Sequence, residues 1–293
     1  MKTLVVITGP TGIGKTDAAI EVAQQLNTEI ISADSRQMYA GMPICTAAPD
    51  ATQLAAIRHH FIGTLALEDY YSAACFETDA LKVINQLFER NDYAVLCGGS
   101  MMYIDAVCKG IDEIPTISDD IRQTVFSEYQ QHGIEPLREE LQRLDPKYYD
   151  IVDLNNPKRV IHAIEICRQS GVPYSTLRTG QSKQRPFRIV KIAFEMERAQ
   201  LFDRINRRVD KMIEQGLEQE ARSLYHLRHL NSLNTVGMKE MFAWFDGEMD
   251  FITARERIKK NTRVYAKKQM TWFAKDPAII RTVPTAAAVL KHL

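Results

Sequence analysis

A glycine-rich loop near the amino terminus constrains the fold of this chain more than any other feature of its sequence. Residues 3–7 are apolar and mostly β-branched, and a helical pattern runs from Asp17 to Leu26. Between them lies the segment Gly9-Pro10-Thr11-Gly12-Ile13-Gly14-Lys15-Thr16. It satisfies the pattern G-x-x-x-x-G-K-[ST], and its place between a predicted strand and a predicted helix makes the match credible.

This pattern predicts a loop that binds phosphate. Its glycines let successive backbone N–H groups converge on phosphate oxygens at the N-terminus of the following helix. We expect Lys15 to supply a positive charge to the phosphates, and the Thr16 hydroxyl to be placed for a magnesium ion. The motif indicates a phosphate ligand without saying which one, so binding of ATP or another nucleotide stays open.

Further apolar strands at 29–33, 93–97 and 187–193 alternate with helical segments. This alternation predicts an α/β fold, a P-loop NTPase-like and mostly parallel sheet with flanking helices. Residues 116–184 show a helical pattern and no strand, so we predict a helical insertion domain there. The core domain then comprises residues 1–115 and 185–293. Long amphipathic helices are expected near 198–229 and 253–275, the second opening with a capping box at residues 253–256.

Composition excludes several classes of protein. No apolar run of the 293-residue chain approaches the roughly 20 residues that span a bilayer. We therefore expect a cytoplasmic protein. The five cysteines form no C-x-x-C pair, which favours buried free thiols over disulfides or a zinc site.

Charge is distributed unevenly although the net charge is zero. Residues 1–115 carry 7 Lys/Arg and 14 Asp/Glu, a net charge of −7, whereas residues 187–275 carry 18 Lys/Arg and 12 Asp/Glu, a net charge of +6. Such asymmetry suggests that the later part of the chain faces an anionic partner, although a solvated helical surface would look similar.

Two further sites bear on the chemistry. ATPases and many kinases place an aspartate after a later apolar strand to hold magnesium, but the strand at 93–97 is followed by Gly98-Gly99-Ser100. The loop therefore favours diphosphate binding over nucleotide hydrolysis. Asp34 follows the strand at 29–33, beside the crevice where open α/β sheets bind ligands. A carboxylate there could hold magnesium, bind a sugar, accept a proton, or merely cap the next turn.

At this point the residues resemble a known family, the tRNA dimethylallyltransferases, also called isopentenyltransferases. The matching segments occur in family order and cover almost the whole chain. They are Gly9-Pro10-Thr11-x-x-Gly14-Lys15-Thr16, Ile31-Ser32-Ala33-Asp34-Ser35-x-Gln37-x-Tyr39, Thr46-Ala47-x-Pro49, His59-His60, Gly98-Gly99-Ser100-x-x-Tyr103, Pro157-x-Arg159-x-x-x-Ala163-x-Glu165, Arg208-Val209-Asp210-x-Met212 and Thr262-Arg263-x-x-Ala266-Lys267-x-Gln269-x-Thr271-Trp272.

The resemblance implies an enzyme that transfers a dimethylallyl group from dimethylallyl diphosphate to the N6 amine of the adenosine 3′-adjacent to the tRNA anticodon. That amine is a poor nucleophile, so it needs a base, and Asp34 is the candidate. Lys15, magnesium at Thr16 and Arg208 would stabilise the departing diphosphate, with Arg204 one turn earlier as a substitute.

The resemblance also implies a set of tRNA-binding residues. Ser35 and Gln37 would hold the edge of the flipped base. The full set is Asp34, Ser35, Arg36, Gln37, Ser100, Arg122, Lys158, Arg159, His162, Lys260, Arg263 and Lys267. Two departures from the family pattern fall within it. Ser100-Met101-Met102 stands where Thr-Gly-Leu is commoner, and His162 replaces a usual arginine, which makes that contact weaker or pH-sensitive.

Two rival interpretations remain at this stage. A small-molecule or nucleotide kinase would use the same loop with ATP, and a nucleotide-gated RNA-binding module would have no use for Asp34. The chain lacks the carboxy-terminal zinc finger of eukaryotic relatives, so the resemblance is to the bacterial type. We expect the protein to be a monomer that does not bind a membrane.

Overall fold

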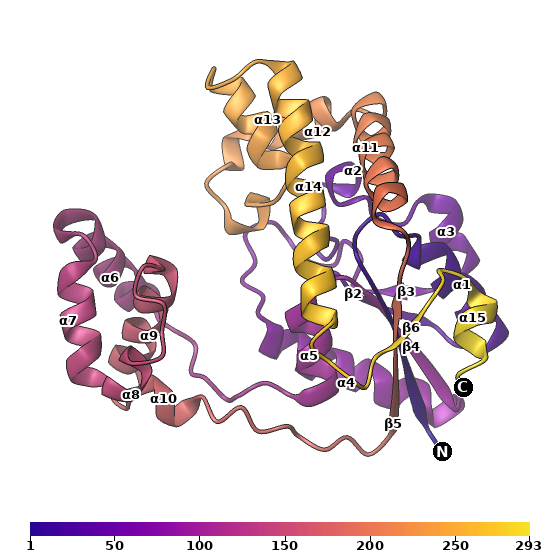
Figure 1. The fold of residues 1–293 in the computed structure, drawn as a ribbon, viewed down its shortest axis with the longest axis horizontal. Coiled ribbons are helices and arrows are strands. Elements are labelled where there is room, and N and C mark those ends of the chain that lie inside the picture. Colours follow the sequence, from indigo (N-terminus) through magenta and orange to yellow (C-terminus); the bar gives the residue numbers. More distant parts are fainter. The chain divides into compact units, whose positions relative to one another are not determined.

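A computed structural model describes residues 1–293, and the chain divides into two compact units. The first unit joins Met1–Cys108 to Gln184–Leu293, and the second is Lys109–Lys183 (Figure 1). The sequence had placed the helical insertion at 116–184, whereas the second unit begins at Lys109, at the end of a helix of the first.

The first unit contains a six-stranded sheet in which every pairing is parallel, which confirms the predicted α/β fold. The strand order is β3-β2-β4-β1-β5-β6. The strands are β1 (Thr3–Thr8), β2 (Ile30–Ala33), β3 (His59–His60), β4 (Tyr93–Gly98), β5 (Arg188–Phe194) and β6 (Ile280–Thr282). The sequence analysis missed β3 and β6, because two or three residues at a sheet edge leave no periodic pattern.

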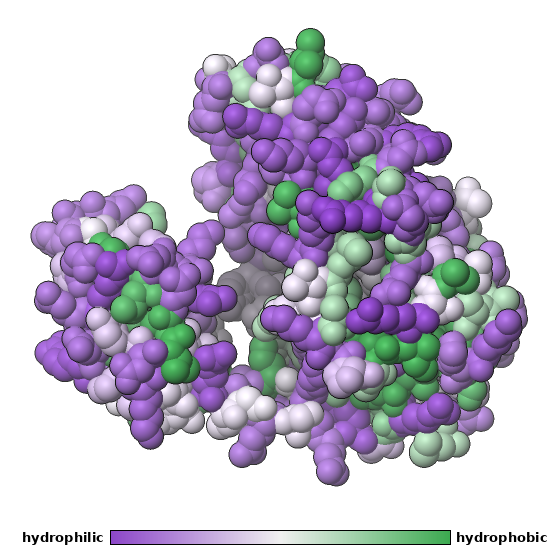
Figure 2. All heavy atoms as spheres, in the orientation of Figure 1, coloured by the Kyte–Doolittle hydropathy of each residue, from purple (hydrophilic) through white to green (hydrophobic).

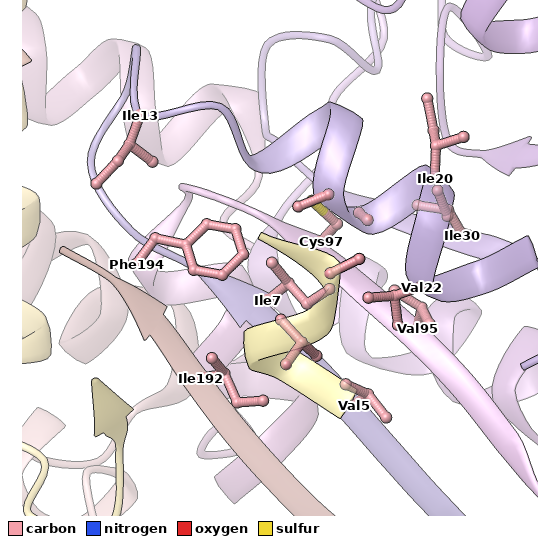
Figure 3. Close-up of a cluster of buried hydrophobic side chains, with 14 of the residues drawn as sticks. Val5, Ile7, Ile13, Ile20, Val22, Ile30, Val95, Cys97, Ile192 and Phe194 are labelled. Carbon is pink, nitrogen blue, oxygen red and sulfur yellow. The ribbon is translucent and has the colours of Figure 1, made fainter. Parts of the chain in front are cut away.

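Alternation along the central strands builds two apolar layers, since successive side chains point to opposite faces. Val5, Ile7 and Val95 pack against α1 (Lys15–Gln25) in one cluster, shown in Figure 3. Leu4, Val6 and Leu96 pack on the other face, among residues of α4 (Ala73–Arg90) and α5 (Met101–Lys109). The continuous apolar runs of these strands follow from burial on both faces.

The helices after β5 form a third apolar cluster. They are α11 (Arg198–Glu214), α12 (Leu217–Leu224), α13 (Met238–Phe245) and α14 (Phe251–Phe273). Smaller elements of this unit are α2 (Pro43–Thr46), α3 (Ala51–Ala56), α15 (Ala286–Leu290) and the 3-10 turns η1 (Tyr225–Leu227) and η2 (Asn231–Leu233).

Two predictions about these helices are wrong. The helix predicted at 198–229 is broken, because Gly216 adopts a φ of 102° between α11 and α12, outside the range of right-handed helix. The capping box predicted at residues 253–256 does not form. Asp250 caps α14 instead, with its carboxylate accepting a hydrogen bond from the Thr253 N–H at 2.6 Å, because it precedes the first helical residue.

The second unit consists of helices only, around its own apolar cluster. The helices are α6 (Asp119–His132), α7 (Glu135–Leu144), α8 (Pro146–Tyr149), α9 (Pro157–Ser170) and α10 (Tyr174–Leu177). The buried Asp145 links α8 to α10. Its carboxylate accepts hydrogen bonds from the Tyr148 N–H of α8 and from the N–H and hydroxyl of Ser175 in α10.

All five cysteines are free, and four of them are buried, as the sequence indicated. None of the helices has the length and apolarity that crossing a bilayer would require. Hydrophilic side chains predominate on the face seen in Figure 2, and hydrophobic ones lie in small separate patches.

Candidate active site

The phosphate loop lies between β1 and α1, as predicted. Gly14 caps α1 in the left-handed region, with a φ of 98°, which lets the chain enter the helix with its first amides turned toward the loop. Any side chain at Gly12 would collide with α11, because a Cβ there would lie 2.9 Å from Cγ1 of Ile205. The loop conformation is therefore fixed by the helix that packs on it.

Lys15 is a cation of the site whose pKa the surrounding protein lowers strongly. Its Nζ donates hydrogen bonds to the carbonyl oxygens of Gly9 at 2.9 Å and Pro10 at 3.0 Å. The pKa of Lys15 is lowered to about 8, chiefly by burial and also by the charge of Arg208, while the acidic groups Cys97 and Asp34 act in the opposite direction. A pKa near 8 leaves most of the ammonium charged at neutral pH, where it can bind a phosphate.

Two cavities of about 380 Å³ each meet beside the loop, both within the first unit. The first cavity contains the phosphate loop and Thr16. The second is lined by residues of α11, α14 and the segment before α13. Four residues border both cavities, namely Thr11, Asp34, Thr46 and Arg208. A group bound in one cavity and a group bound in the other would therefore meet at Asp34.

Asp34 fills one of the roles that the sequence left open, that of capping a turn, and its position leaves the others available. Its Oδ1 accepts hydrogen bonds from the backbone N–H groups of Arg36 at 3.0 Å and Gln37 at 3.3 Å, so it does cap the turn after β2. These bonds use one carboxylate oxygen and hold the side chain in place. The residue borders both cavities, which leaves its chemistry available to a ligand in either one.

The basic residues of α11 lie at the same junction. Arg208 is largely buried and borders both cavities, and burial lowers the pKa of its guanidinium while Asp34 opposes that shift. Arg204 borders the first cavity, and a Cβ at Gly14 would lie 3.2 Å from its Nη2. The structure thus brings both candidate cations, one helical turn apart, to the phosphate loop.

The residues expected to hold the acceptor base are partly engaged with the protein. The Ser35 N–H donates to the Ser100 Oγ at 2.8 Å. The Gln37 Nε2 donates to the carbonyl oxygens of Thr46 and Ala47, both at 3.2 Å. One Arg36 nitrogen donates to the carbonyls of residues 231 and 232. Tyr265, which the sequence analysis did not select, borders the second cavity beside Ser100.

The missing aspartate after β4 has a steric cause. A Cβ at Gly98 would lie 2.2 Å from the Ala33 carbonyl oxygen, and a Cβ at Gly99 would lie 2.4 Å from the Gln269 Nε2. The backbone leaves no room for a side chain at Gly98, and a side chain at Gly99 would displace the Gln269 amide, which gives a steric reason for glycine at both positions. Gln269 was part of a matching segment without an assigned role, and its buried amide contacts the phosphate loop itself.

The adjacent histidines of β3 point to opposite faces of the sheet, as expected for a strand. His60 Nε2 lies 2.6 Å from Oε2 of Glu29, in a structural pair. His59 borders the first cavity, and its Nε2 is buried without a hydrogen-bond partner. His59, His60 and Glu29 are not arranged to bind a metal ion. No other group of three or more His, Cys, Asp or Glu side chains is arranged to bind one either.

The candidate RNA contacts fall in both units. Arg122, Lys158, Arg159 and His162 belong to α6 and α9 of the second unit, and the last three are exposed. On α14 of the first unit, Arg263 donates to Oδ1 of Asn206, Lys267 lies 5.5 Å from the centre of the Phe202 ring, and Lys260 is exposed. Asn156 occupies the N-cap position of α9, but its side chain makes no capping hydrogen bond.

His162 differs electrostatically from the arginine usual at its position. Although about half of the His162 side chain is exposed, desolvation of its imidazole by the surrounding protein and the positive charge of Arg122 lower its pKa below the ordinary value of 6.5. Its nearest acidic partner is Glu165, whose Oε2 lies 3.8 Å from Nδ1. The side chain is therefore neutral at pH 7 and offers no net charge to a phosphate.

Comparison with known protein families identifies one match. The family model described as IPP transferase matches residues 37–276. Among curated proteins, tRNA dimethylallyltransferase 1 of Bacteroides thetaiotaomicron is 54% identical over 279 residues, 95% of this chain and 91% of that protein. The tRNA dimethylallyltransferase 2 of Parabacteroides distasonis is 51% identical over 294 residues, 100% of this chain and 98% of that protein.

Solved structures agree with these matches. The full-length tRNA isopentenylpyrophosphate transferase of Bacillus halodurans has a TM-score of 0.70 and 35% identity, over 97% of this chain and 91% of that one. A eukaryotic dimethylallyltransferase acting on tRNA has a TM-score of 0.82 over 98% of this chain and 75% of that one. At 24% identity, the second likeness shows the fold alone.

Proposed function

The chain belongs to the IPP transferase family, that of the tRNA dimethylallyltransferases, and from that premise we propose how its site performs the reaction. It is a prenyltransferase that moves a dimethylallyl group from dimethylallyl diphosphate to tRNA and releases diphosphate. The acceptor is the N6 amine of the adenosine 3′-adjacent to the anticodon. The observation that supports the catalytic roles proposed for Asp34 and Arg208 is that both residues border the two cavities where these meet.

The diphosphate occupies the first cavity, against the backbone N–H groups that open α1. Lys15 supplies a positive charge beneath it, and Arg208 and Arg204 supply two more from α11. The allylic carbon then projects toward Asp34. As the bond between that carbon and the bridging oxygen breaks, negative charge grows on the leaving group, and fixed cations stabilise it more than they stabilise the substrate.

The adenine occupies the second cavity with its exocyclic amine directed at Asp34. Nitrogen forms a bond to the allylic carbon, and the amine proton passes to the free oxygen of the Asp34 carboxylate. Forming this bond uses the nitrogen lone pair, so without a base to take the proton the nitrogen would keep a positive charge. The turn capped by Asp34 Oδ1 fixes this base within reach of both cavities, which favours direct transfer.

Magnesium is the proposed cofactor, and the donor set at the loop fits it. The Thr16 hydroxyl borders the first cavity, and oxygen ligands are those that magnesium prefers. As glycines, Gly98 and Gly99 supply no second protein ligand from the end of β4, where a side chain would meet the Ala33 backbone or the Gln269 amide. The remaining ligands would be diphosphate oxygens and water, as is common for this ion. Bound there, magnesium would neutralise part of the charge on the diphosphate.

The anticodon stem-loop is the proposed partner of the exposed basic residues on α9 and α14. Ser35, Ser100 and Gln37 would contact the flipped base or its neighbours from the turn after β2. Base flipping is required because the N6 amine is inaccessible while the base is stacked. Binding should weaken steeply with salt, since phosphate contacts release counterions.

The test is transfer of label from dimethylallyl diphosphate, with magnesium, to an unmodified anticodon stem-loop that carries adenosine 3′ of the anticodon. We expect label in the RNA with the wild-type protein and with Asp92→Ala, a control at an exposed aspartate paired only with Lys2. We expect none with Asp34→Ala, which should still bind the diphosphate. Normal turnover by Asp34→Ala would exclude the proposed base, and phosphate transfer from ATP without RNA labelling would exclude the function.

A further inference from the structure

Gln269 of α14 is the one side chain that joins the phosphate loop to the turn after β4. It is 1% exposed. Its Oε1 accepts a hydrogen bond from the Thr11 N–H at 2.8 Å, and its Nε2 donates one to the Gly99 carbonyl oxygen at 2.8 Å. The two contacts link segments 258 and 170 residues away in the sequence. A primary amide suits this position because it carries an acceptor and a donor side by side.

The amide also lies close to the catalytic lysine. A Cβ built on Gly99 would lie 2.4 Å from the Gln269 Nε2 and 3.7 Å from the Lys15 Nζ. The Gln269 amide and the Lys15 ammonium therefore border the same side of Gly99. A shift of Gln269 would remove its hydrogen bond to the Gly99 carbonyl oxygen and change the packing beside the Lys15 ammonium.

The bond to Thr11 also determines which amides of the loop remain for a ligand. The Thr11 N–H points at Gln269, and the Ile13 N–H donates to the Pro10 carbonyl oxygen. The amides that open α1, from Gly14 to Thr16, make neither of these bonds and can converge on phosphate. Without an acceptor at residue 269, the part-buried Thr11 N–H would lose its hydrogen-bond partner, which favours a loop conformation in which this N–H bonds elsewhere.

We propose that Gln269 is a positioning residue that holds the phosphate loop in the conformation that binds diphosphate. It touches neither substrate and acts through Thr11 and Gly99. The inference rests on the proposed function only in taking a diphosphate as the ligand of the loop. With this role for Gln269, α14 has two functions on different faces. Its buried face orders the diphosphate site, and its exposed lysines are the proposed RNA contacts.

The first experiment compares Gln269→Met with Gln219→Met, a matched change at an exposed glutamine of α12. Calorimetry with inorganic diphosphate and magnesium gives the Kd, and binding of the stem-loop is measured separately. We expect Gln269→Met to raise the diphosphate Kd about tenfold or more, as the loss of hydrogen bonds of ordinary strength implies, and to leave the stem-loop Kd unchanged. We expect Gln219→Met to change neither.

Gln269→Glu tests the hydrogen-bond role through the pH dependence of diphosphate binding, which a residue with only a packing role would not change. A protonated carboxyl group can accept from Thr11 and donate to Gly99 as the amide does, whereas a carboxylate cannot donate. Burial favours the protonated form. The ratio of the Gln269→Glu Kd to the wild-type Kd for inorganic diphosphate should therefore fall toward one as the pH is lowered from 8 to 5.5. A ratio that does not change with pH would overturn the proposed hydrogen-bond role.

A double-mutant cycle keeps the proposal testable if the methionine variant folds poorly. Gly99→Ala places a methyl group against Gln269 and should weaken diphosphate binding, while Gln269→Ala makes room for it. The two effects should therefore be strongly non-additive. Additive effects, or a folded Gln269→Met that binds diphosphate as the wild type does, would overturn the inference. Failure of the proposed function would show differently, as intact diphosphate binding with no label in RNA.

Discussion

The Ser35 N–H donates a hydrogen bond to the Ser100 Oγ at 2.8 Å, and this contact ties the turn after β2 to the start of α5. Ser100 in turn donates to the Ser35 Oγ at 3.2 Å, and its own N–H donates to the Ala33 carbonyl oxygen at 3.1 Å. The ends of β2 and β4 are thereby locked together beside Asp34. A base held by this turn would meet a rigid surface, which favours alignment of its amine with the carboxylate.

Asp34→Asn should abolish turnover while keeping the fold of the site. The amide oxygen can still accept from the Arg36 and Gln37 N–H groups, but it cannot take a proton from the amine. We expect single-turnover transfer to slow by about 10²- to 10⁴-fold, with the Kd for dimethylallyl diphosphate unchanged. A rate within threefold of wild type would remove Asp34 from the role of base.

Binding of dimethylallyl diphosphate at pH 8.5 should take up a proton at Lys15. The pKa of about 8 leaves much of this side chain neutral in the free protein, and a bound diphosphate favours the charged form. Calorimetry in buffers of different ionisation enthalpy measures the uptake, which Lys15→Met should lack. Equal heats in all buffers would contradict the lowered pKa.

The same pKa shift has a consequence for stability. Between about pH 8 and pH 10.5 the unfolded chain keeps the Lys15 proton that the folded chain has lost. The unfolded state then binds more protons, so this group makes the free energy of unfolding rise with pH across that window. We expect the wild type to gain stability relative to Lys15→Met over these pH values in urea titrations. A constant difference would show that the lysine is not desolvated.

His162→Arg should strengthen stem-loop binding at pH 7.5. The histidine is neutral there, because burial and Arg122 lower its pKa, whereas arginine keeps its charge. We expect the slope of log Kd against log salt to steepen by about one unit, as one added phosphate contact requires. With the wild type, binding should tighten only as the pH falls below 6.5. An unchanged slope would place residue 162 away from the RNA backbone.

Gly98→Ala should destabilise the protein strongly. A methyl group 2.2 Å from the Ala33 carbonyl oxygen forces β2 and β4 apart, and we expect a loss of about 2–3 kcal/mol or more in the free energy of unfolding. Chemical denaturation of Gly98→Ala and of the wild type measures it. A small loss at Gly98 would refute the steric reason for the missing aspartate.

Local sequence determined the parts of this protein whose causes are local. The phosphate loop with its flanking strand and helix, the central strands and the helical character of residues 116–184 all follow from periodicity and residue type over a few positions. Asp34 was identified in the same way, because it follows a buried strand at the edge where parallel sheets bind ligands. The matching segments added the chemistry that such patterns cannot specify.

Tertiary structure alone decided how distant segments complete the site. Nothing in the sequence around Gln269 indicates that its amide meets Thr11 and Gly99, because a buried polar partner is chosen by the packing of α14 on the loop. Likewise, β3 and β6 form only because β2 and β5 offer edges for them to pair with. The lowered pKa of Lys15 has the same origin, since desolvation depends on every segment that surrounds the charge and not on the residues beside it in the chain.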